Sequence, residues 1–280
     1  MVYLNGKFIK KDQAFVSVMD RGFLFGDSVY EVLPVYNGNF FCIKPHLNRL
    51  AESLKATNIS NPYSFEQWSE ILHELIAHHP NRQYQSIYLQ VTRGCDVDRK
   101  HTYGELSPTV YMQSTPFQNS NKDQYMLGGS AITRNDIRWS QCNTKATSLL
   151  ANIMYAQEAK QNNVDEVILC RENVVTECSS SNLFIIKDGC VYTHPKGSHI
   201  LPGITREVVL ECADYCGINT EEVAISKDDL LNADEVWISS STREVLPITR
   251  IDNTFINQGK VGDIWPLVYD RFQVEKTRNS

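Results

Sequence analysis

From residue 176 to residue 184 the chain reads Thr-Glu-Cys-Ser-Ser-Ser-Asn-Leu-Phe, and from 201 to 206 it reads Leu-Pro-Gly-Ile-Thr-Arg. Each segment lies where an apolar, strand-like run meets small, hydrogen-bonding residues. The first places a carboxylate, Glu177, beside three hydroxyls, and the second opens a predicted helix at Gly203. A helix start offers free backbone N–H groups and a positive dipole end, which suit a phosphate. Together the segments predict a site for a phosphorylated, basic heteroaromatic cofactor.

The bulk composition fits a globular protein of one large or two modest domains. The chain has 280 residues, 42% of them hydrophobic, and a formal net charge of −6 at pH 7 without a long basic run. This balance argues against nucleic acid or an anionic membrane as the main partner. No signal peptide or membrane span is predicted, and the eight cysteines lack framework spacing. We therefore expect a cytoplasmic protein with reduced thiols and no metal.

The first third of the chain combines hairpins with helices. Asn5-Gly6 and Asn37-Gly38 are hairpin turns, joining residues 2–4 to 7–10 and residues 29–36 to 39–43. Apolar residues at helical spacing predict helices over 45–56 and 64–78, and strands are predicted over 84–93 and 109–114. This order of elements indicates an α+β fold.

A polar, aperiodic stretch at 116–124 predicts a linker between a small domain (1–115) and a larger domain (125–280). In the larger domain we expect strands over 125–133, 166–170, 174–177, 183–187, 191–193 and 235–239. We expect helices over 149–161, 205–216 and 228–231. Short turns between the strands favour an antiparallel sheet or barrel.

Lys145 is the first candidate for chemistry. It lies among small, polar and apolar residues, and no acidic residue stands within several positions. These surroundings favour the neutral amine that a Schiff base requires. From local sequence alone a solvated surface lysine is the commoner case, so both interpretations are open at this point.

Glu177 is the second candidate, at the end of the β-branched run 174–176. A carboxylate there could hold a pyridinium proton through a charge-assisted hydrogen bond, or it could face water at a strand end. The hydroxyls of residues 179–181 could contact the same cofactor, or they could be ordinary turn residues.

Three further groups could bind anions. Arg49, on a predicted helix, could bind a phosphate bidentately or lie on the surface. Arg99 and His101 could hold a carboxylate or belong to an exposed charged loop. Residues 239–242, Ser-Ser-Ser-Thr, could form an anion-binding nest or a turn at a strand end.

In combination these residues resemble the fold type IV enzymes that depend on pyridoxal phosphate (PLP). Residues 20–31, Asp-Arg-Gly-Phe-Leu-Phe-Gly-Asp-Ser-Val-Tyr-Glu, look like the N-terminal signature of that family, and the likeness covers nearly the whole chain. Within the family, residues 90–94, 136–139 and 192–195 are most similar to D-amino-acid transaminases. The resemblance implies a two-domain α+β fold, with a small α/β N-terminal domain. The larger C-terminal domain would contain a pseudo-barrel of mostly antiparallel strands flanked by helices.

The resemblance also implies roles for individual positions. Lys145 corresponds to the lysine that binds PLP as a Schiff base and moves the proton, and Glu177 corresponds to the acid paired with the pyridine nitrogen. The other implied cofactor-binding residues are Arg49, Ser180, Ser181, Leu201, Ile204, Thr205 and Ser241. The implied substrate-binding residues are Tyr30, Arg99, His101 and Thr242. The implied assembly is a homodimer in which Arg99 and His101 reach the neighbouring active site.

Two positions depart from the family pattern. The loop 94–99 is one residue longer and carries Asp96 and Asp98, whose charges could weaken the attraction for a carboxylate. Arg243 stands where a small polar residue is usual, and it could contact an anion or point to solvent.

The implied reaction moves an amino group between D-amino acids, such as D-alanine and D-glutamate, and 2-oxo acids, such as 2-oxoglutarate and pyruvate. The two half-reactions make the expected mechanism ping-pong. A branched-chain aminotransferase, an (R)-amine transaminase and an aminodeoxychorismate lyase are alternatives of the same fold, and the pair Arg99 and His101 argues against the first two. A non-catalytic protein would be expected to lack Lys145 or Glu177.

Overall fold

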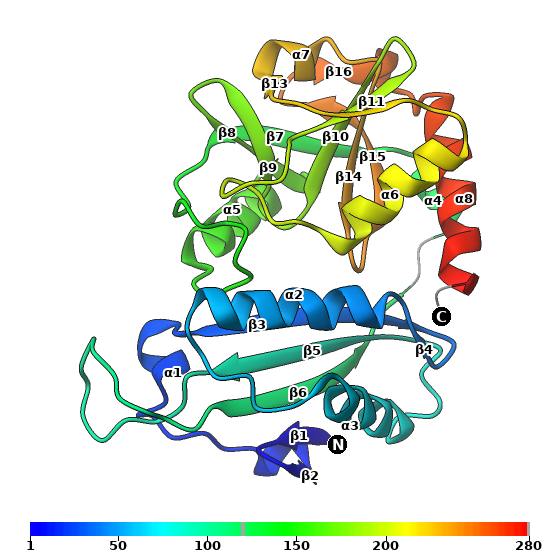
Figure 1. Cartoon of the computed structure of the whole chain (residues 1–280). Coiled ribbons are helices and arrows are strands. Elements are labelled where there is room, and N and C mark those ends of the chain that lie inside the picture. The colour runs from blue at the N-terminus through cyan, green and yellow to red at the C-terminus, as the bar shows by residue number, and fades with distance from the viewer. Residues whose placement is uncertain (119–120, 279–280) are drawn as a thin grey trace. The chain divides into compact units, whose positions relative to one another are not determined.

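The computed structural model describes residues 1–118 and 121–278, which form two compact units (Figure 1). The first unit comprises Met1–Gln118 together with Thr144–Leu149, and the second comprises residues 121–143 together with Leu150–Arg278. The predicted linker, 116–124, spans this division, and its residues 119 and 120 lie outside the described residues. Local sequence does not predict that residues 144–149 return to the first unit.

The first unit is built on one antiparallel sheet of six strands in the order β2-β1-β6-β5-β3-β4. Its strands are β1 (Val2–Leu4), β2 (Lys7–Ile9), β3 (Ser28–Tyr36), β4 (Asn39–Phe40), β5 (Tyr84–Thr92) and β6 (Thr109–Pro116). Its helices are η1 (Lys11–Gln13), α1 (Arg21–Phe25), α2 (Ile43–Ala56) and α3 (Phe65–Ala77). The predicted hairpin turns are confirmed, because Asn5, Gly6, Asn37 and Gly38 all have the positive φ that such turns require.

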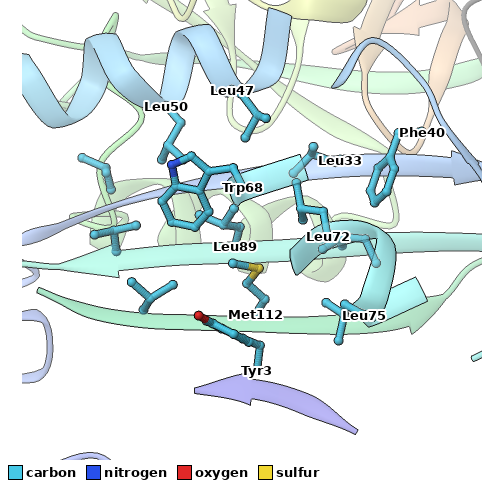
Figure 2. Packing of buried hydrophobic residues seen from close by; sticks show 14 of the residues in the cluster. Tyr3, Leu33, Phe40, Leu47, Leu50, Trp68, Leu72, Leu75, Leu89 and Met112 are labelled. Carbon is cyan, nitrogen blue, oxygen red and sulfur yellow. The ribbon is translucent and has the colours of Figure 1, made fainter. Parts of the chain in front are cut away.

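Helices α2 and α3 supply most of the helical side chains of the first unit's core (Figure 2). Leu47 and Leu50 from α2, and Trp68 and Leu72 from α3, pack with Leu89 of the sheet. Truncating one such buried leucine to alanine typically costs about 2–5 kcal/mol. Ser64 caps α3 through a capping box with Gln67, which fixes where the helix begins. This core makes α2 and β3 a stable frame for the residues they carry.

The second unit contains ten strands in one sheet, ordered β12-β11-β10-β14-β15-β7-β8-β9-β13, with β16 paired to β15. Its strands are β7 (Gly129–Asn135), β8 (Glu166–Arg171), β9 (Val174–Cys178), β10 (Asn182–Lys187), β11 (Cys190–Thr193), β12 (Thr220–Glu222), β13 (Ile225–Ser226), β14 (Glu235–Ser240), β15 (Glu244–Ile251) and β16 (Thr254–Phe255). Its helices are α4 (Lys122–Tyr125), α5 (Leu150–Gln161), α6 (Ile204–Tyr215), α7 (Lys227–Leu231), η2 (Ile256–Gly259) and α8 (Ile264–Arg278).

The predicted fold class is confirmed in this unit. The sheet is mostly antiparallel, with parallel pairs only at β7–β8, β7–β15 and β11–β12 among the strands described. It curls into a half-barrel that α5 and α6 flank (Figure 1). The predicted strand over 125–133 begins too early, because Tyr125 ends helix α4 and β7 starts at Gly129. Within the described residues, no helix is both long enough and apolar enough to cross a membrane.

Candidate active site

Lys145 belongs to the segment that returns to the first unit, where it is fixed against β3. Its carbonyl accepts a hydrogen bond from Tyr30 N (2.9 Å), and its own N–H donates to Ser53 Oγ (3.3 Å) on α2. The next residue, Ala146, bridges to Val29. Lys145 Nζ lies 4.4 Å from the centroid of the Tyr30 ring. The structure therefore brings together the predicted catalytic lysine and a predicted substrate-binding tyrosine.

Arg49, on α2, is held by a buried carboxylate of β3. Its Nε and Nη2 donate to the two oxygens of Glu31, both at 2.8 Å, and the Nδ1 of His46 lies 2.8 Å from Glu31 Oε2. Burial works to raise the pKa of Glu31, but the Arg49 charge and hydrogen bonds outweigh it and lower that pKa. Burial also lowers the pKa of His46, so the charged pair at pH 7 is Glu31 with Arg49. Glu31 thus fixes the orientation of the guanidinium.

Arg99 and His101 lie in the exposed loop between β5 and β6 and share one aromatic platform. The Arg99 guanidinium lies 4.9 Å from the centroid of the Phe25 ring, and the His101 ring packs edge-on against Phe25 at 5.6 Å. Asp98 pairs with Lys100 at 3.1 Å. Of the two acids expected to weaken carboxylate attraction, Asp96 and Asp98, the second therefore has a lysine partner, and Arg99 lies over the ring.

In the second unit, Glu177 is a buried carboxylate at the end of β9, so the interpretation of a strand-end acid facing water is wrong. Its Oε2 accepts from the Leu201 backbone N–H (3.0 Å) and from the Asn182 side chain (2.9 Å). Its Oε1 accepts from Arg138 Nη1 at 2.5 Å. Asn182 also donates to the Leu201 carbonyl (2.8 Å). The segments 176–184 and 201–206 are thus joined directly.

Arg138 is a residue of this site that sequence reasoning did not assign. Besides Glu177 it contacts Asp136 with Nε (3.0 Å) and Nη2 (2.9 Å), and Arg171 also reaches Asp136 (3.1 Å). Burial works to lower the pKa of Arg138, but these carboxylates outweigh it and raise that pKa above its ordinary value. Glu177 therefore stays beside a permanent positive charge, which favours its ionised form.

Helix α6 begins at Ile204, directly after Gly203, which has no side chain to bond the first-turn N–H groups. A Cβ at Gly203 would lie 2.0 Å from Asn182 Oδ1, so only glycine lets the helix start this close to Asn182. Ser239 pairs with Asn182 across β10 and β14. Its buried hydroxyl has no hydrogen-bond partner among the residues that the structure describes. The helix start and this hydroxyl are groups that a phosphorylated ligand could satisfy.

The three serines that follow Glu177 surround a different carboxylate, Glu166. Ser180 and Ser181 donate to Glu166 Oε2 at 2.7 and 3.0 Å, and Ser179 donates to Oε1. Arg243 Nη1 lies 3.3 Å from the same Oε2, so Arg243 pairs with Glu166. A hydroxyl that donates to Glu166 can still accept a hydrogen bond. The predicted cofactor contacts of Ser180 and Ser181 stay predictions, and they would have to use this accepting capacity.

Ser241 and Thr242 lie in the turn between β14 and β15. Ser241 is half-buried and Thr242 is exposed. The turn is held by Tyr125, whose hydroxyl donates to the Arg243 carbonyl at 2.7 Å. The cofactor contact of Ser241 and the substrate contact of Thr242 stay predictions.

The family model for amino-transferase class IV matches residues 28–251. The chain belongs to this family. A D-alanine aminotransferase of Listeria monocytogenes is 41% identical over 99% of this chain and 96% of its own length. A D-alanine aminotransferase of Bacillus licheniformis is 42% identical over 97% of this chain and 95% of its own. The class IV membership confirms the resemblance drawn from sequence, and enzymes of this family use PLP.

A solved class IV structure shows the same fold. The branched-chain aminotransferase of Thermoproteus uzoniensis, with norvaline, superposes with a TM-score of 0.87 at 26% identity, over 99% of this chain and 95% of its own. The predicted two-domain α+β architecture with its half-barrel is therefore confirmed as that of the class IV family. Lys145 lies within the matched residues 28–251, as do Glu177 and the pair Arg99 and His101.

Proposed function

We propose that this class IV enzyme is a PLP-dependent transaminase that moves an amino group between D-amino acids and 2-oxo acids. The observation that carries the proposal is the sequence identity of 41–42%, over nearly the whole chain, to enzymes named D-alanine aminotransferase. The solved branched-chain enzyme shares the fold at only 26% identity. The branched-chain and lyase alternatives are therefore supported less well.

The second unit offers donors and acceptors that fit the two ends of PLP. We propose that Glu177 accepts a hydrogen bond from the protonated pyridine nitrogen, because the groups described on it, from Arg138, Asn182 and Leu201, are donors that favour its ionised form. The first-turn N–H groups of Ile204 and Thr205, with Ser241, would hold the phosphate. Leu201 would pack against the ring. Bound PLP supplies the electron sink for a carbanion.

From the first unit, the family resemblance supports Lys145 as the residue that binds PLP covalently and Arg49 as a further phosphate ligand. Once the substrate amine has displaced it, Lys145 Nζ would remove the α-proton and later return a proton. Glu31 would keep the Arg49 guanidinium in one orientation, since both of its oxygens are bonded to that group.

Tyr30, Arg99 and His101 would bind the α-carboxylate of the substrate and so select the D enantiomer, with Thr242 as a further contact. A guanidinium and an imidazole are suited to this because both donate hydrogen bonds to carboxylate oxygens. The shared Phe25 platform supports their acting together.

We also propose a homodimer in which Arg99 and His101 serve the neighbouring active site. The first unit exposes Phe23 and Val97, which are 71% and 88% exposed, on segments that an Asp20–Cys95 bridge joins. Helix α5 of the second unit exposes Leu150 and Ile153. Exposed large apolar side chains of this kind are typical of protein–protein contacts. None of the eight cysteines, all within the described residues, forms a disulfide, which supports a cytoplasmic location.

Replacing Arg99 with alanine is expected to raise the KM for D-alanine by about 10- to 10²-fold, because a charge-assisted contact to a carboxylate is worth about 1.5–3 kcal/mol. The occupancy of PLP should not change, since Arg99 has no proposed contact with it. Steady-state kinetics and cofactor absorbance measure the two quantities. An unchanged KM would remove Arg99 from the substrate site.

Mixing two variants that are each inactive at low D-alanine concentration tests the contribution from the neighbouring subunit. Lys145→Ala and Arg99→Ala dimers, allowed to exchange subunits, should regain activity at low D-alanine. In a hybrid dimer one site has both a native Lys145 from one chain and a native Arg99 from the other. If the mixture stays as inactive as its parents while subunit exchange is demonstrated, Arg99 acts within its own chain.

A further inference from the structure

One buried arginine, Arg21, holds the backbone of the loop that carries Arg99 and His101. Its Nη1 donates to the Lys100 carbonyl at 2.6 Å and its Nη2 to the His101 carbonyl at 3.0 Å. The side chain is only 4% exposed, whereas the loop around it is exposed. We propose that Arg21 is a positioning residue for substrate recognition, because it fixes the carbonyl of Lys100, between the two members of the carboxylate-binding pair, and the carbonyl of His101 itself. The proposal rests on the proposed function of Arg99 and His101.

Arg21 is itself fixed to the frame of the first unit. Its Nε donates to Asp27 Oδ2 at 2.9 Å, and Arg93 binds both oxygens of Asp27 at 2.7 and 2.9 Å. Arg93 also donates to the carbonyls of Thr57 and Asn58, each at 2.7 Å, just beyond the end of α2. Asp27, through Arg93, therefore links Arg21 to the packed helix α2. The hydrogen bonds from Arg21 in turn hold the loop to this well-packed part of the unit.

The short helix α1 contacts the side chains of Arg99 and His101 as well as the backbone of their loop. Arg21 begins α1 and Phe25 ends it, and the Phe25 ring contacts Arg99, His101 and the Arg21 guanidinium, the last at 4.8 Å. Asp20 caps the helix by accepting from Gly22 N (2.8 Å), and Thr92 of β5 donates to Asp20 (3.0 Å). The loop thus takes both its path and its aromatic platform from α1.

Positioning of this kind matters because Arg99 and His101 must meet one carboxylate together. A loop held only by its ends would lose conformational entropy each time substrate binds, and that cost would weaken binding. Because the carbonyls of residues 100 and 101 are already bonded to Arg21, the loop loses this conformational entropy during folding and not when substrate binds. The effect should fall on recognition of the carboxylate, not on the chemistry at Lys145.

The test compares Arg21→Met and Arg21→Lys with the unmodified holoenzyme. Arg21→Met should raise the KM for D-alanine about tenfold while kcat and PLP occupancy change less than about twofold. The KM of Arg21→Lys should lie between those of the unmodified enzyme and Arg21→Met, because an ammonium keeps the charge beside Asp27 but cannot span both carbonyls. Arg82→Met is the matched control, since Arg82 also donates to a backbone carbonyl of the first unit, that of Ser114. It should leave KM unchanged.

A double substitution separates positioning from a general structural effect. Arg21→Met combined with Arg99→Ala should raise KM by less than the product of the two single effects, because Arg21 acts through the loop and only His101 is left for it to position. Additive effects, or a fall in kcat and PLP occupancy with an unchanged KM, would overturn the proposal. Phe25→Leu, which removes the platform and leaves the hydrogen bonds of Arg21 to the loop carbonyls in place, should raise KM in the same selective way and covers the case of an Arg21→Met chain that does not fold. If Arg99→Ala itself leaves KM unchanged, the proposed function fails instead.

Discussion

Replacing Lys145 with alanine will lower transaminase turnover by about 10²–10⁴-fold, because it removes the proposed general base. The substitution should leave the backbone of this segment in place. The hydrogen bonds that place residue 145, from Tyr30 N and to Ser53 Oγ, use backbone atoms that alanine also has. The loss should therefore come from the missing amine and not from a displaced segment. Turnover of D-alanine with 2-oxoglutarate, measured on protein saturated with PLP, checks the expected loss.

Borohydride reduction followed by peptide mass mapping provides the second readout for Lys145. The unmodified protein should carry reduced cofactor on the peptide that contains residue 145, and Lys145→Ala should carry none there. Lys55→Ala is the control, because Lys55 is an exposed lysine of the same unit on α2. A Lys145→Ala chain that still traps cofactor at full occupancy would show that another amine binds it.

Replacing Glu177 with glutamine will lower kcat by about 10²-fold or more, because the proposed pyridinium partner loses its charge. All three side-chain or backbone groups described on Glu177 are donors, from Arg138, Asn182 and Leu201. A glutamine amide turned either way would therefore point its NH2 group at a donor. The variant should also unfold at a lower temperature, because a buried ion pair with Arg138 is broken.

Glu235→Gln is the matched control for Glu177→Gln. Glu235 is a similarly buried carboxylate of the second unit, and it accepts from Trp237 Nε1 and from the first N–H groups of α8. This control should lower thermal stability without lowering kcat of the PLP-bound enzyme. If the two variants lose kcat equally, the effect of Glu177→Gln is structural and its role at the pyridine nitrogen is wrong.

The parts of the structure that local sequence predicts are those with local causes. The hairpins at Asn5-Gly6 and Asn37-Gly38 depend on residues that adopt positive φ, and α2 and α3 follow from apolar spacing. Helix α8 and strand β15 were not predicted. Helix α8 contains Pro266 and strand β15 contains Pro247. Pro266 is tolerated because it lies in the first turn of α8.

The parts of the candidate site that sequence reasoning missed depend on long-range contacts. Lys145 pairs with β3, far away in the sequence, and no local pattern indicates that partner. Arg138 and Asn182 bind Glu177, yet alone each reads as an ordinary polar residue. Glu166 opens an apolar strand, and only the fold shows that the three serines after Glu177 all donate to it.

A single half-reaction of the PLP-bound enzyme, run without any 2-oxo acid, tests whether the protein is a transaminase of D-amino acids. The absorbance of the bound cofactor is followed after mixing with D-alanine, L-alanine or L-leucine in parallel. The expected result is that D-alanine converts the cofactor at least about 10²-fold faster than either L-amino acid, since a misplaced carboxylate forfeits contacts worth roughly 3 kcal/mol. Faster conversion by L-leucine than by D-alanine would contradict it and favour a branched-chain aminotransferase.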